Sequence, residues 1–564
     1  MARPIRALLL AAALCAAGHA AAELPKVLGE AAWPSAKRAE TGLRLAAPEL
    51  ARAPVARMEL PPPEPAALAA LAAPEKRSAI GIARSVTPAA APVWSTLADG
   101  RRVAHLQVRS ASAAATRAGL VVRSLPAGAR VRFAAADGRG AVVEQDGAEA
   151  SEAVRSQGIS WGPVVEGDTQ VVEIELAPGA DPGPVRFTVA QVSHLVAGPS
   201  TGFAKVAAAT CQEDVACVAA SNPAVDAARR AVVKMVYTEN GATYTCTGTL
   251  VNDTDASSQI PYLHTASHCI ASQAAAATLN TFWFYEASSC GGASAAPVQL
   301  TRGAKLLHAN ESTDVALLRL NDAAPAGAWF AGWNPNPPAA STPVVAIHHP
   351  RGDVKKVSIG QALGLATEAG DNLIAAAWIA GTTEPGSSGS GLFTLDGGQY
   401  LLRGGLKGGS ASCASTGVVS NPANRDYYSR LDLDFAKLTA VLSAQGAPEA
   451  DYSDLWWNPE EPGWGLSVVQ HASNATMVMW FTYDEAGKPT WFFVSDCKWE
   501  GSRRCAGTAY RTKGSPWMQP VSPGALALES VGALALDFGA ADDVSIRGTL
   551  LGVALSKRAV RQVF

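Results

Sequence analysis

The segment 383–391 reads Thr-Glu-Pro-Gly-Ser-Ser-Gly-Ser-Gly and places a serine between glycines, directly after a proline–glycine pair. That pair favours a sharp turn. Such a turn can expose a serine hydroxyl while two backbone N–H groups converge beside it, as the alkoxide that forms on an attacked carbonyl requires. Glycine–serine stretches are also common linkers. The interpretation therefore depends on whether the chain supplies the partners of a reactive serine.

Two other stretches supply those partners. A serine hydroxyl is a poor nucleophile near neutral pH, so it needs a base, usually histidine, and the base needs a buried carboxylate. His268 lies in the stretch Leu263-His264-Thr265-Ala266-Ser267-His268-Cys269, and Asp314 opens the apolar run Asp314-Val315-Ala316-Leu317-Leu318. The candidates follow one another in the order histidine, aspartate, serine.

These stretches resemble the signatures of the chymotrypsin-fold serine proteases. Residues 265–269 resemble the motif T-A-A-H-C, and residues 314–318 resemble D-[IV]-A-L-L. Residues 386–390 resemble G-D-S-G-G with two substitutions. The resemblance implies a mainly β fold with a two-barrel protease domain, and the many short strand-like runs between glycines and prolines are typical of such barrels.

The same resemblance implies a role for each residue of the site. Ser388 is expected to be the nucleophile, His268 the general base and acid, and Asp314 the carboxylate that orients the imidazole. The backbone N–H groups of Gly386 and Ser388 are expected to form the oxyanion hole.

A narrower resemblance is to the bacterial lysyl endopeptidases of the Achromobacter protease I type. It rests on three stretches, which are Thr383-Glu384-Pro385-Gly386-Ser387-Ser388-Gly389-Ser390, Ala346-Ile347-His348-His349-Pro350 and Gly408-Gly409-Ser410-Ala411-Ser412-Cys413. The cysteine spacing fits as well. Spacing alone leaves the disulfides open. The pairing of that family implies the disulfides Cys211–Cys413, Cys217–Cys290 and Cys246–Cys269.

Cleavage after a basic residue needs an anion at the bottom of the substrate pocket, because a buried ammonium is costly when unpaired. In the resembled family an aspartate just past the last cysteine has this role, and the matching residue here is Asp426. Asp432 and Asp434 are rivals, and a solvated loop aspartate is the alternative interpretation. Lys407 stands where the family has a histidine, so a cation is expected beside the substrate channel. The segment between Cys413 and Asp426 is also longer here.

Other histidines suggest different chemistry. His264 lies four residues before His268, a spacing that suits zinc on a helix, but Thr265 stands where H-E-x-x-H requires glutamate. No C-x-x-C pair is present either, so neither a metal nor another cofactor is expected. His348 and His349 are candidates for a place near the site, with polar packing in a loop as the alternative.

The amino terminus is typical of an export signal. Two arginines precede an apolar run over residues 7–17, and small residues suit signal cleavage after Ala22. The eight cysteines that follow Cys15 form an even set, which is typical of disulfides in an exported chain. No later stretch suits a membrane helix, and the net charge of −3 favours no nucleic-acid partner. The protein is therefore expected to be secreted.

Composition divides the chain after the signal peptide, residues 1–22, into three parts. Residues 23–205 are expected to be a propeptide, alanine- and proline-rich and extended or mobile at first, then β-rich from about residue 94. Residues 206–446 are expected to form the trypsin-like protease domain, with a helix near its end over 434–444. Residues 450–564 carry half of the 14 tryptophans and are expected to form a β module, a meander built on two strands, with Cys497 and Cys505 closing a loop.

The resemblance also bears on maturation. In that family the mature enzyme starts five residues before the first cysteine, after a lysine, which here corresponds to the bond between Lys205 and Val206. A lysine at that place suits self-cleavage, and an ordinary surface lysine is the alternative. Ser387 stands where mammalian trypsins keep an aspartate that pairs with the new amino terminus, so no such ion-pair switch is expected. The propeptide would assist folding and cover the cleft.

The sequence therefore predicts a secreted serine endopeptidase that hydrolyses protein and peptide substrates after lysine and is made as a self-processed zymogen. Arginine specificity is one alternative. A second is a protease-fold binding or adhesion protein with little activity, whose tryptophan-rich module contacts a cell surface or polysaccharide. Exposed tryptophans would favour such binding, and core packing is expected for most of them.

Overall fold

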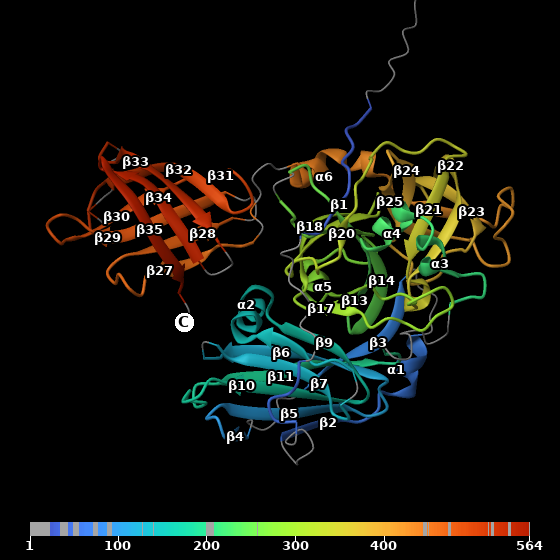
Figure 1. Cartoon of the computed structure of the whole chain (residues 1–564), viewed down its shortest axis with the longest axis horizontal. Helices are drawn as coiled ribbons and strands as arrows, with labels where there is room; N and C mark the ends of the chain where they lie inside the picture. The colour runs from blue at the N-terminus through green and yellow to red at the C-terminus, as the bar shows by residue number, and fades with distance from the viewer. Residues whose placement is uncertain are drawn as a thin grey trace, which may run out of the picture.

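The computed structural model describes residues 23–33, 43–48, 56–71, 77–86, 93–126, 128–138, 140–198, 208–255, 258–443, 448, 450–471, 475–516, 518–519, 524–539 and 543–562. The predicted export signal and the bond between Lys205 and Val206 lie outside the described residues. Within those residues the fold is mainly β, as predicted, with two barrels, strands that precede them and a further sheet that follows them (Figure 1). None of the described helices is long and apolar enough to cross a bilayer.

The first barrel is a curved antiparallel sheet. β14 pairs with β13 on one side and with β15 on the other, and β15 pairs in turn with β19. β13 is buried on both faces, so its sequence is a nearly continuous apolar run. The elements are β12 (Glu213–Asp214), α3 (Val215–Ala219), α4 (Pro223–Arg229), β13 (Val232–Glu239), β14 (Ala242–Val251), β15 (Tyr262–Thr265), α5 (Gln273–Ala277), β16 (Asn280–Trp283), β17 (Val298–Leu300), β18 (Ala304–Asn310), β19 (Val315–Leu320) and β20 (Trp329–Phe330).

The second barrel closes on itself. The strand order β22-β21-β24-β25-β26-β23 returns to β22, which leaves no free edge in the ring. Trp378 and Tyr428 are buried inside it. The helix predicted near the end of this part forms over Phe435–Leu442 and packs against the core of the first barrel. The elements are β21 (Pro343–His348), η3 (Pro350–Gly352), β22 (Lys356–Glu368), β23 (Asp371–Ala380), β24 (Gly391–Asp396), β25 (Gln399–Gly409), β26 (Asp426–Tyr428), η4 (Leu431–Leu433) and α6 (Phe435–Leu442).

The strands before the barrels form two layers around one core. β2, β5, β10, β7 and β8 make one sheet, which packs on β6, β9 and β11. Leu106 and Leu120 are among the buried contacts between the layers. The elements are β2 (Ala56–Leu60), α1 (Pro65–Ala70), β3 (Ser78–Ser85), β4 (Trp94–Thr96), β5 (Arg102–Ser110), β6 (Ala115–Ser124), β7 (Arg130–Ala135), β8 (Val143–Asp146), α2 (Gly147–Gln157), β9 (Ser160–Glu166), β10 (Thr169–Leu176) and β11 (Arg186–Leu195).

Strand β3 joins these layers to the first barrel. It pairs with β11, where Gly81 lies opposite Leu195, and with β14, where Ile82 lies opposite Ala242. A Cβ atom at Gly81 would lie 2.5 Å from a methyl carbon of Leu195, so the close approach requires glycine. Composition predicts an extended or mobile chain before residue 92, whereas the structure places β3 inside a continuous sheet. The difference arises because strand pairing depends on distant partners that local composition does not report.

The first described residues form a strip, residues 24–33, that contacts both barrels. Its strand β1 (Glu30–Ala31) pairs with β20. The side chain of Lys26 forms an ion pair with Asp396 of the second barrel at 2.9 Å. On the other side, the Nε2 atom of Gln259 in the first barrel donates a hydrogen bond to the carbonyl of Ala31. The strip is extended, as the composition predicts, but it is bound.

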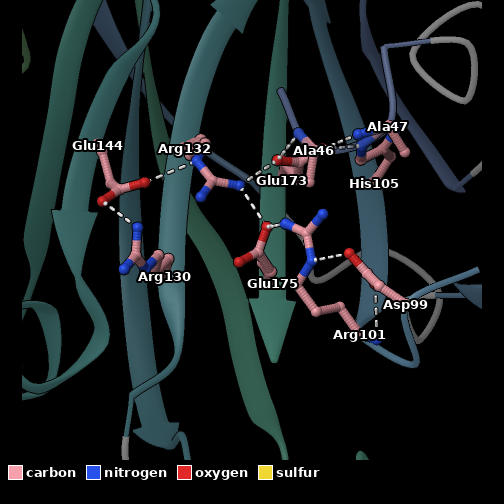
Figure 2. Close-up of polar contacts among 10 residues, drawn as sticks. All are labelled: Ala46, Ala47, Asp99, Arg101, His105, Arg130, Arg132, Glu144, Glu173 and Glu175. Atoms are coloured by element: carbon pink, nitrogen blue, oxygen red, sulfur yellow. Dashed lines mark hydrogen bonds and ion pairs between the residues drawn. The ribbon is translucent and has the colours of Figure 1, made fainter. Parts of the chain in front are cut away.

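A buried ionic network fixes another early segment to the sheet (Figure 2). Glu173 on β10 accepts hydrogen bonds from the backbone N–H groups of Ala46 and Ala47. Its carboxylate also contacts Arg132 at 3.0 Å and the Nε2 atom of His105 at 2.7 Å. Buried charges are tolerated only when they are paired and hydrogen-bonded. The labelled members of the network are Ala46, Ala47, Asp99, Arg101, His105, Arg130, Arg132, Glu144, Glu173 and Glu175.

The last sheet is larger than the expected two-strand meander. Its nine strands run in the order β30-β29-β28-β27-β35-β34-β33-β32-β31, and β30 also pairs with β32. Trp456 and Trp480 are buried, and two further tryptophans pack against the same core. Trp457 and Trp491 are 37% and 43% exposed. The strands are β27 (Asp454–Trp457), β28 (Gly465–Gln470), β29 (Thr476–Tyr483), β30 (Pro489–Val494), β31 (Lys498–Trp499), β32 (Arg504–Lys513), β33 (Ala527–Phe538), β34 (Asp543–Leu550) and β35 (Val553–Arg561).

Candidate active site

The loop 383–391 lies against the first barrel, although it leads into a strand of the second. Thr247 on β14 donates from its Oγ1 atom to the carbonyl of Gly386 at 3.0 Å and from its N–H to the carbonyl of Ser388 at 2.9 Å. Gly386 has a φ of 96°, a conformation that favours glycine. The sharp turn predicted from the proline–glycine pair is thus held by one threonine of the other barrel.

The peptide groups of this loop have a defined orientation. The N–H of Arg351 donates to the carbonyl of Pro385 at 2.6 Å. Because the C=O and N–H of a trans peptide point in opposite directions, this bond turns the N–H of Gly386 away from Arg351. The carbonyl of Ser387 accepts a hydrogen bond from the N–H of Ser390 at 3.0 Å. By the same argument, this bond turns the N–H of Ser388 away from Ser390.

His268 and Asp314 form the pair that the motifs predict. His268 follows β15 and Asp314 precedes β19, and the pairing of Thr265 with Ala316 brings the two together. The Nδ1 atom of His268 lies 2.8 Å from Oδ2 of Asp314, and its backbone N–H donates to Oδ1 at 2.9 Å. Asp314 has a φ of 58°, which is uncommon outside glycine and typical of functional sites.

This contact fixes the state of the imidazole. An ionised carboxylate only accepts hydrogen bonds, so Nδ1 of His268 carries the proton and Nε2 is the basic nitrogen. Within the described residues, Nε2 has no hydrogen-bond partner. The arrangement can take a proton from a hydroxyl at Nε2.

The serine loop packs directly on the turn that carries His268. A Cβ atom at Gly389 would lie 2.2 Å from Oγ1 of Thr265 and 2.8 Å from the backbone nitrogen of Ala266. The residue beside Ser388 is therefore in contact with the chain two residues before His268. The structure brings the serine loop and the histidine–aspartate pair to one seam between the barrels.

Cysteines lie in pairs at disulfide distance. One pair, Cys246 and Cys269, joins β14 to the residue that follows His268. The pairs are Cys211–Cys413, Cys217–Cys290, Cys246–Cys269 and Cys497–Cys505.

Asp426 is 1% exposed and lies at the start of β26, between β23 and β25. Its Oδ2 atom accepts hydrogen bonds from Nε1 of Trp378 at 2.6 Å and from Oγ1 of Thr383 at 2.7 Å. Burial raises the pKa of Asp426, and these hydrogen bonds oppose that effect. Thr383 belongs to the serine loop, so the carboxylate is linked directly to it.

The rival carboxylates have other partners. Asp432 forms an ion pair with Arg430. Asp434 accepts hydrogen bonds from Nε2 of His308 at 2.9 Å and from the side chain of Asn310 at 2.8 Å.

Lys407 departs from the resembled family, and the structure places its ammonium in an ion pair with Asp371 at the start of β23. The side chain of Lys407 is 13% exposed. Its charge is therefore compensated by a carboxylate of its own barrel.

The remaining histidines lie in the interior. His264 is on β15 rather than on a helix, and burial lowers its pKa to about 4. His348 is fully buried with both ring nitrogens hydrogen-bonded, and its neighbour His349 contacts the carbonyl of Asp353 through Nδ1.

Sequence reasoning misses the residues that support the site. Thr247 holds two carbonyls of the serine loop, and Trp378 holds Asp426. Both lie far along the chain from their partners and within ordinary strand sequence. The stretch around His348 is singled out by its resemblance, but its contact with the serine loop requires the fold.

Comparison with known proteins gives two family matches. Residues 51–196 match the lysyl endopeptidase N-terminal domain. Residues 206–429 match the lysyl endopeptidase C-terminal domain.

Known sequences and solved structures add individual relatives. The chain is 38% identical over 374 residues to a lysyl endopeptidase of Pseudomonas aeruginosa, covering 63% of this chain and 77% of that protein. A protease from M. tuberculosis in its active form aligns with a TM-score of 0.28 at 17% identity, covering 41% of this chain and 88% of its own. An HtrA-type protease bound to a tripeptide aligns with a TM-score of 0.28 at 13% identity, covering 60% and 96%.

The sequence relative and the two family matches agree with the paired histidine and aspartate at the seam of the barrels. The chain belongs to the lysyl endopeptidase family and is a serine endopeptidase.

Proposed function

We propose that this protein is a secreted endopeptidase that cuts after lysine and is made with an N-terminal propeptide that it removes itself. The observation that carries the specificity is Asp426, a buried carboxylate linked to the serine loop. The donors to its carboxylate include the side chains of Trp378 and Thr383 and backbone N–H groups, all of which are uncharged.

We propose the following catalytic steps for this site. Ser388 attacks the scissile carbonyl while Nε2 of His268 takes the proton of its hydroxyl. Asp314 holds the imidazole in the required tautomer and stabilises the imidazolium. The N–H groups of Gly386 and Ser388 face the developing oxyanion, and the histidine then protonates the leaving amine. Water repeats the sequence on the acyl-enzyme and frees Ser388.

A buried carboxylate with neutral donors favours a cationic guest. Hydrogen bonds stabilise the ionised form of Asp426, whereas burial disfavours it because the carboxylate has lost its solvating water. A substrate ammonium that enters the pocket supplies the positive charge that a buried carboxylate needs as a partner. Lys407 does not cancel this preference, because its own ammonium is paired with Asp371. These contacts favour a basic side chain, and the resemblance to lysyl endopeptidases favours lysine over arginine.

Contacts just after the proposed processing bond support maturation at Lys205–Val206. The N–H of Ala208 donates to Asp353 at 3.2 Å, and the N–H of Ala209 donates to Glu384 of the serine loop at 3.0 Å. Ala208 and Ala209, the third and fourth residues of the proposed mature enzyme, are therefore anchored beside the serine loop. The preceding domain is attached through β3, which fits a propeptide that assists folding of the first barrel.

The terminal module supports a binding role in addition to catalysis. Trp457, Phe481 and Trp491 are exposed on neighbouring strands of one sheet, with Trp457 opposite Gly465 and Phe481 opposite Trp491. Exposed aromatic faces of this kind suit polysaccharide or a cell surface, and we propose such a contact for this module. Secretion is supported by the cysteine pairs.

Cleavage of a peptide library, combined with amino-terminal sequencing of the mature protein, tests the proposal. We expect cleavage after lysine and a mature sequence that begins at Val206. Asp426→Asn should reduce kcat/KM for lysine substrates by about 100-fold or more, because a charged partner of the substrate is lost. An equal reduction of kcat/KM for substrates with a neutral side chain would show that Asp426 does not bind the basic side chain of the substrate.

A further inference from the structure

His348 connects the second barrel to the serine loop through its ring. It is the last residue of β21 and is fully buried. Its Nδ1 atom lies 2.8 Å from Oγ of Ser387, the residue directly before Ser388. Its Nε2 atom lies 3.0 Å from Oγ of Ser358 on β22. Both serine side chains are buried as well.

The hydrogen bonds of this chain have one consistent direction. The hydroxyl of Ser358 donates to the carbonyl of Thr382 at 3.1 Å, so its oxygen accepts from the N–H at Nε2 of His348. Nδ1 is then an acceptor, and the hydroxyl of Ser387 donates to it. The oxygen of Ser387 in turn accepts the N–H of Glu384 at 3.2 Å.

The ring is therefore neutral, and it holds the loop at two places. One end of the chain fixes the carbonyl of Thr382, where the loop begins. The other end fixes the side chain of Ser387, which lies between the two peptide groups that supply the proposed oxyanion donors. Burial, together with the positive charge of Lys356, lowers the pKa of His348 to about 3, which keeps the ring uncharged near neutral pH.

We propose that His348 is a positioning residue that holds the oxyanion loop in its working shape through uncharged hydrogen bonds, before any bond of the chain is cut. The inference rests on the proposed role of Ser388 and its neighbours. In the trypsins, an ion pair between an aspartate and the new amino terminus shapes this loop. Ser387 stands in place of that aspartate and has no charge, so the proposal gives the same role to the hydrogen bond between His348 and Ser387. Among the described residues, the hydrogen bonds of the His348 ring are to Ser387 and Ser358, while Ala209 reaches the same loop separately, through the side chain of Glu384.

The experiment compares four variants of the chain, each allowed to mature in the same way: His348→Phe, Ser387→Ala, the double variant, and His349→Phe. His349→Phe is the matched control, since it replaces the neighbouring buried ring, which stacks on Tyr285 and contacts Asp353 rather than the loop. Four quantities are measured. They are kcat and KM for a lysyl peptide amide, inhibition by a peptide aldehyde, and inhibition by butylamine.

The aldehyde forms a tetrahedral adduct that needs the oxyanion donors, whereas butylamine only fills the pocket for the basic side chain. We expect His348→Phe to reduce kcat by about 10- to 100-fold, because small displacements of catalytic groups cost rates of this order. Aldehyde binding should weaken by a similar factor, while KM and butylamine inhibition stay unchanged. Ser387→Ala should reproduce this effect, and the double variant should lose no more than either single variant.

Partial recovery in His348→Asn, whose side-chain oxygen can accept from Ser387, would support the proposal further. Equal losses in aldehyde and butylamine binding would indicate a general structural defect and overturn it. So would additive losses in the double variant, or an unchanged kcat in both single variants. Hydrolysis that survives Ser388→Ala would instead overturn the proposed function itself. Ser387→Ala removes only one oxygen atom, so it keeps the test decisive if His348→Phe does not fold.

Discussion

The indole N–H of Trp378 donates a hydrogen bond to Oδ2 of Asp426 across 2.6 Å, and both residues are buried in the second barrel. A buried tryptophan thus stabilises the ionised form of Asp426, the proposed specificity residue. A hydrogen bond to the ionised form lowers the pKa of a carboxyl, so this bond opposes the rise that burial causes.

Replacing Trp378 by phenylalanine should therefore shift the pH dependence of specificity. Without the indole donor, the already raised pKa of Asp426 rises further, and the ionised form that binds lysine is lost at a higher pH. One hydrogen bond to a charged group corresponds to a shift of about one pH unit or more. The measurement is the ratio of kcat/KM for a lysine substrate to kcat/KM for a neutral substrate across pH, because this ratio cancels every pH effect that the two substrates share. A uniform loss at every pH would contradict the assignment.

Glu173 should make the N-terminal domain sensitive to acid. Burial raises its pKa, but hydrogen bonds from His105, from the amide of Ala46 and from Arg132 lower it more, so the pKa lies below the ordinary 4.5. A lowered carboxyl pKa adds stability that is fully present above about pH 4.5 and is lost as the pH falls through the folded-state pKa. Glu173→Gln should therefore destabilise the domain near neutral pH by about 3 kcal/mol.

Urea unfolding and amide hydrogen exchange in residues 43–48 measure this effect. The difference between Glu173→Gln and the wild type should narrow in acid, where the wild-type carboxyl is itself protonated. Asp99→Asn, at the exposed end of the same network, serves as the control and should change little. A difference that stays constant with pH would exclude the carboxylate as its source.

Gly29 should control whether the strip over the two barrels can bind. A Cβ atom there would lie 2.6 Å from Nε1 of Trp329 and 2.7 Å from the carbonyl of Phe330. Gly29→Val should release the strip, whereas Leu28→Ala should not, because Leu28 is 53% exposed.

The readout is the bond between Lys26 and Val27 in an inactive Ser388→Ala chain that is treated with an added lysine-specific protease. In the docked strip this bond should resist cleavage, and Gly29→Val should make it sensitive at the same protease concentration. Rapid cleavage in the Leu28→Ala control as well would mean that the strip is not held in solution.

The uncleaved chain should already possess a reactive Ser388. Lys205→Ala blocks the proposed processing bond but leaves the contacts of His268 and Asp314 intact. A small organophosphorus fluoride should label this variant at a rate comparable with that of the mature enzyme, and Ser388→Ala should remain unlabelled. Labelling that begins only after an added protease cuts the chain near residue 206 would show that the site forms by cleavage.

The sequence predicts those parts of the molecule whose signal is local. The apolar run that begins at Val315 is strand-like, and the structure has a strand over Val315–Leu320, because a short apolar run is a signal that acts within a few positions. The motifs around His268 and Asp314 place catalytic residue types at the ends of strands, where the pairing of β15 and β19 brings them together.

Other features depend on partners that lie far away in the chain. Nothing within residues 78–85 indicates that they pair with β14 as well as β11. The sequence shows that Ser387 replaces the aspartate of the trypsins. It does not show that Ser387 contacts the ring of His348, which lies 39 residues earlier in the chain. Such contacts are set by the closure of the second barrel and cannot be derived from local periodicity.

Strand β3 has a consequence for the fate of the molecule after processing. If the N-terminal domain departs, the backbone groups of residues 242–245 that pair with β3 become an unprotected edge on the enzyme. Dissociation of the N-terminal domain requires these backbone hydrogen bonds to break together, so we expect dissociation to be slow. The exposed edge of β14 should then pair with a second copy of the protein or with an extended peptide. The stability of the processed enzyme in concentrated solution thus depends on a strand that takes no part in catalysis.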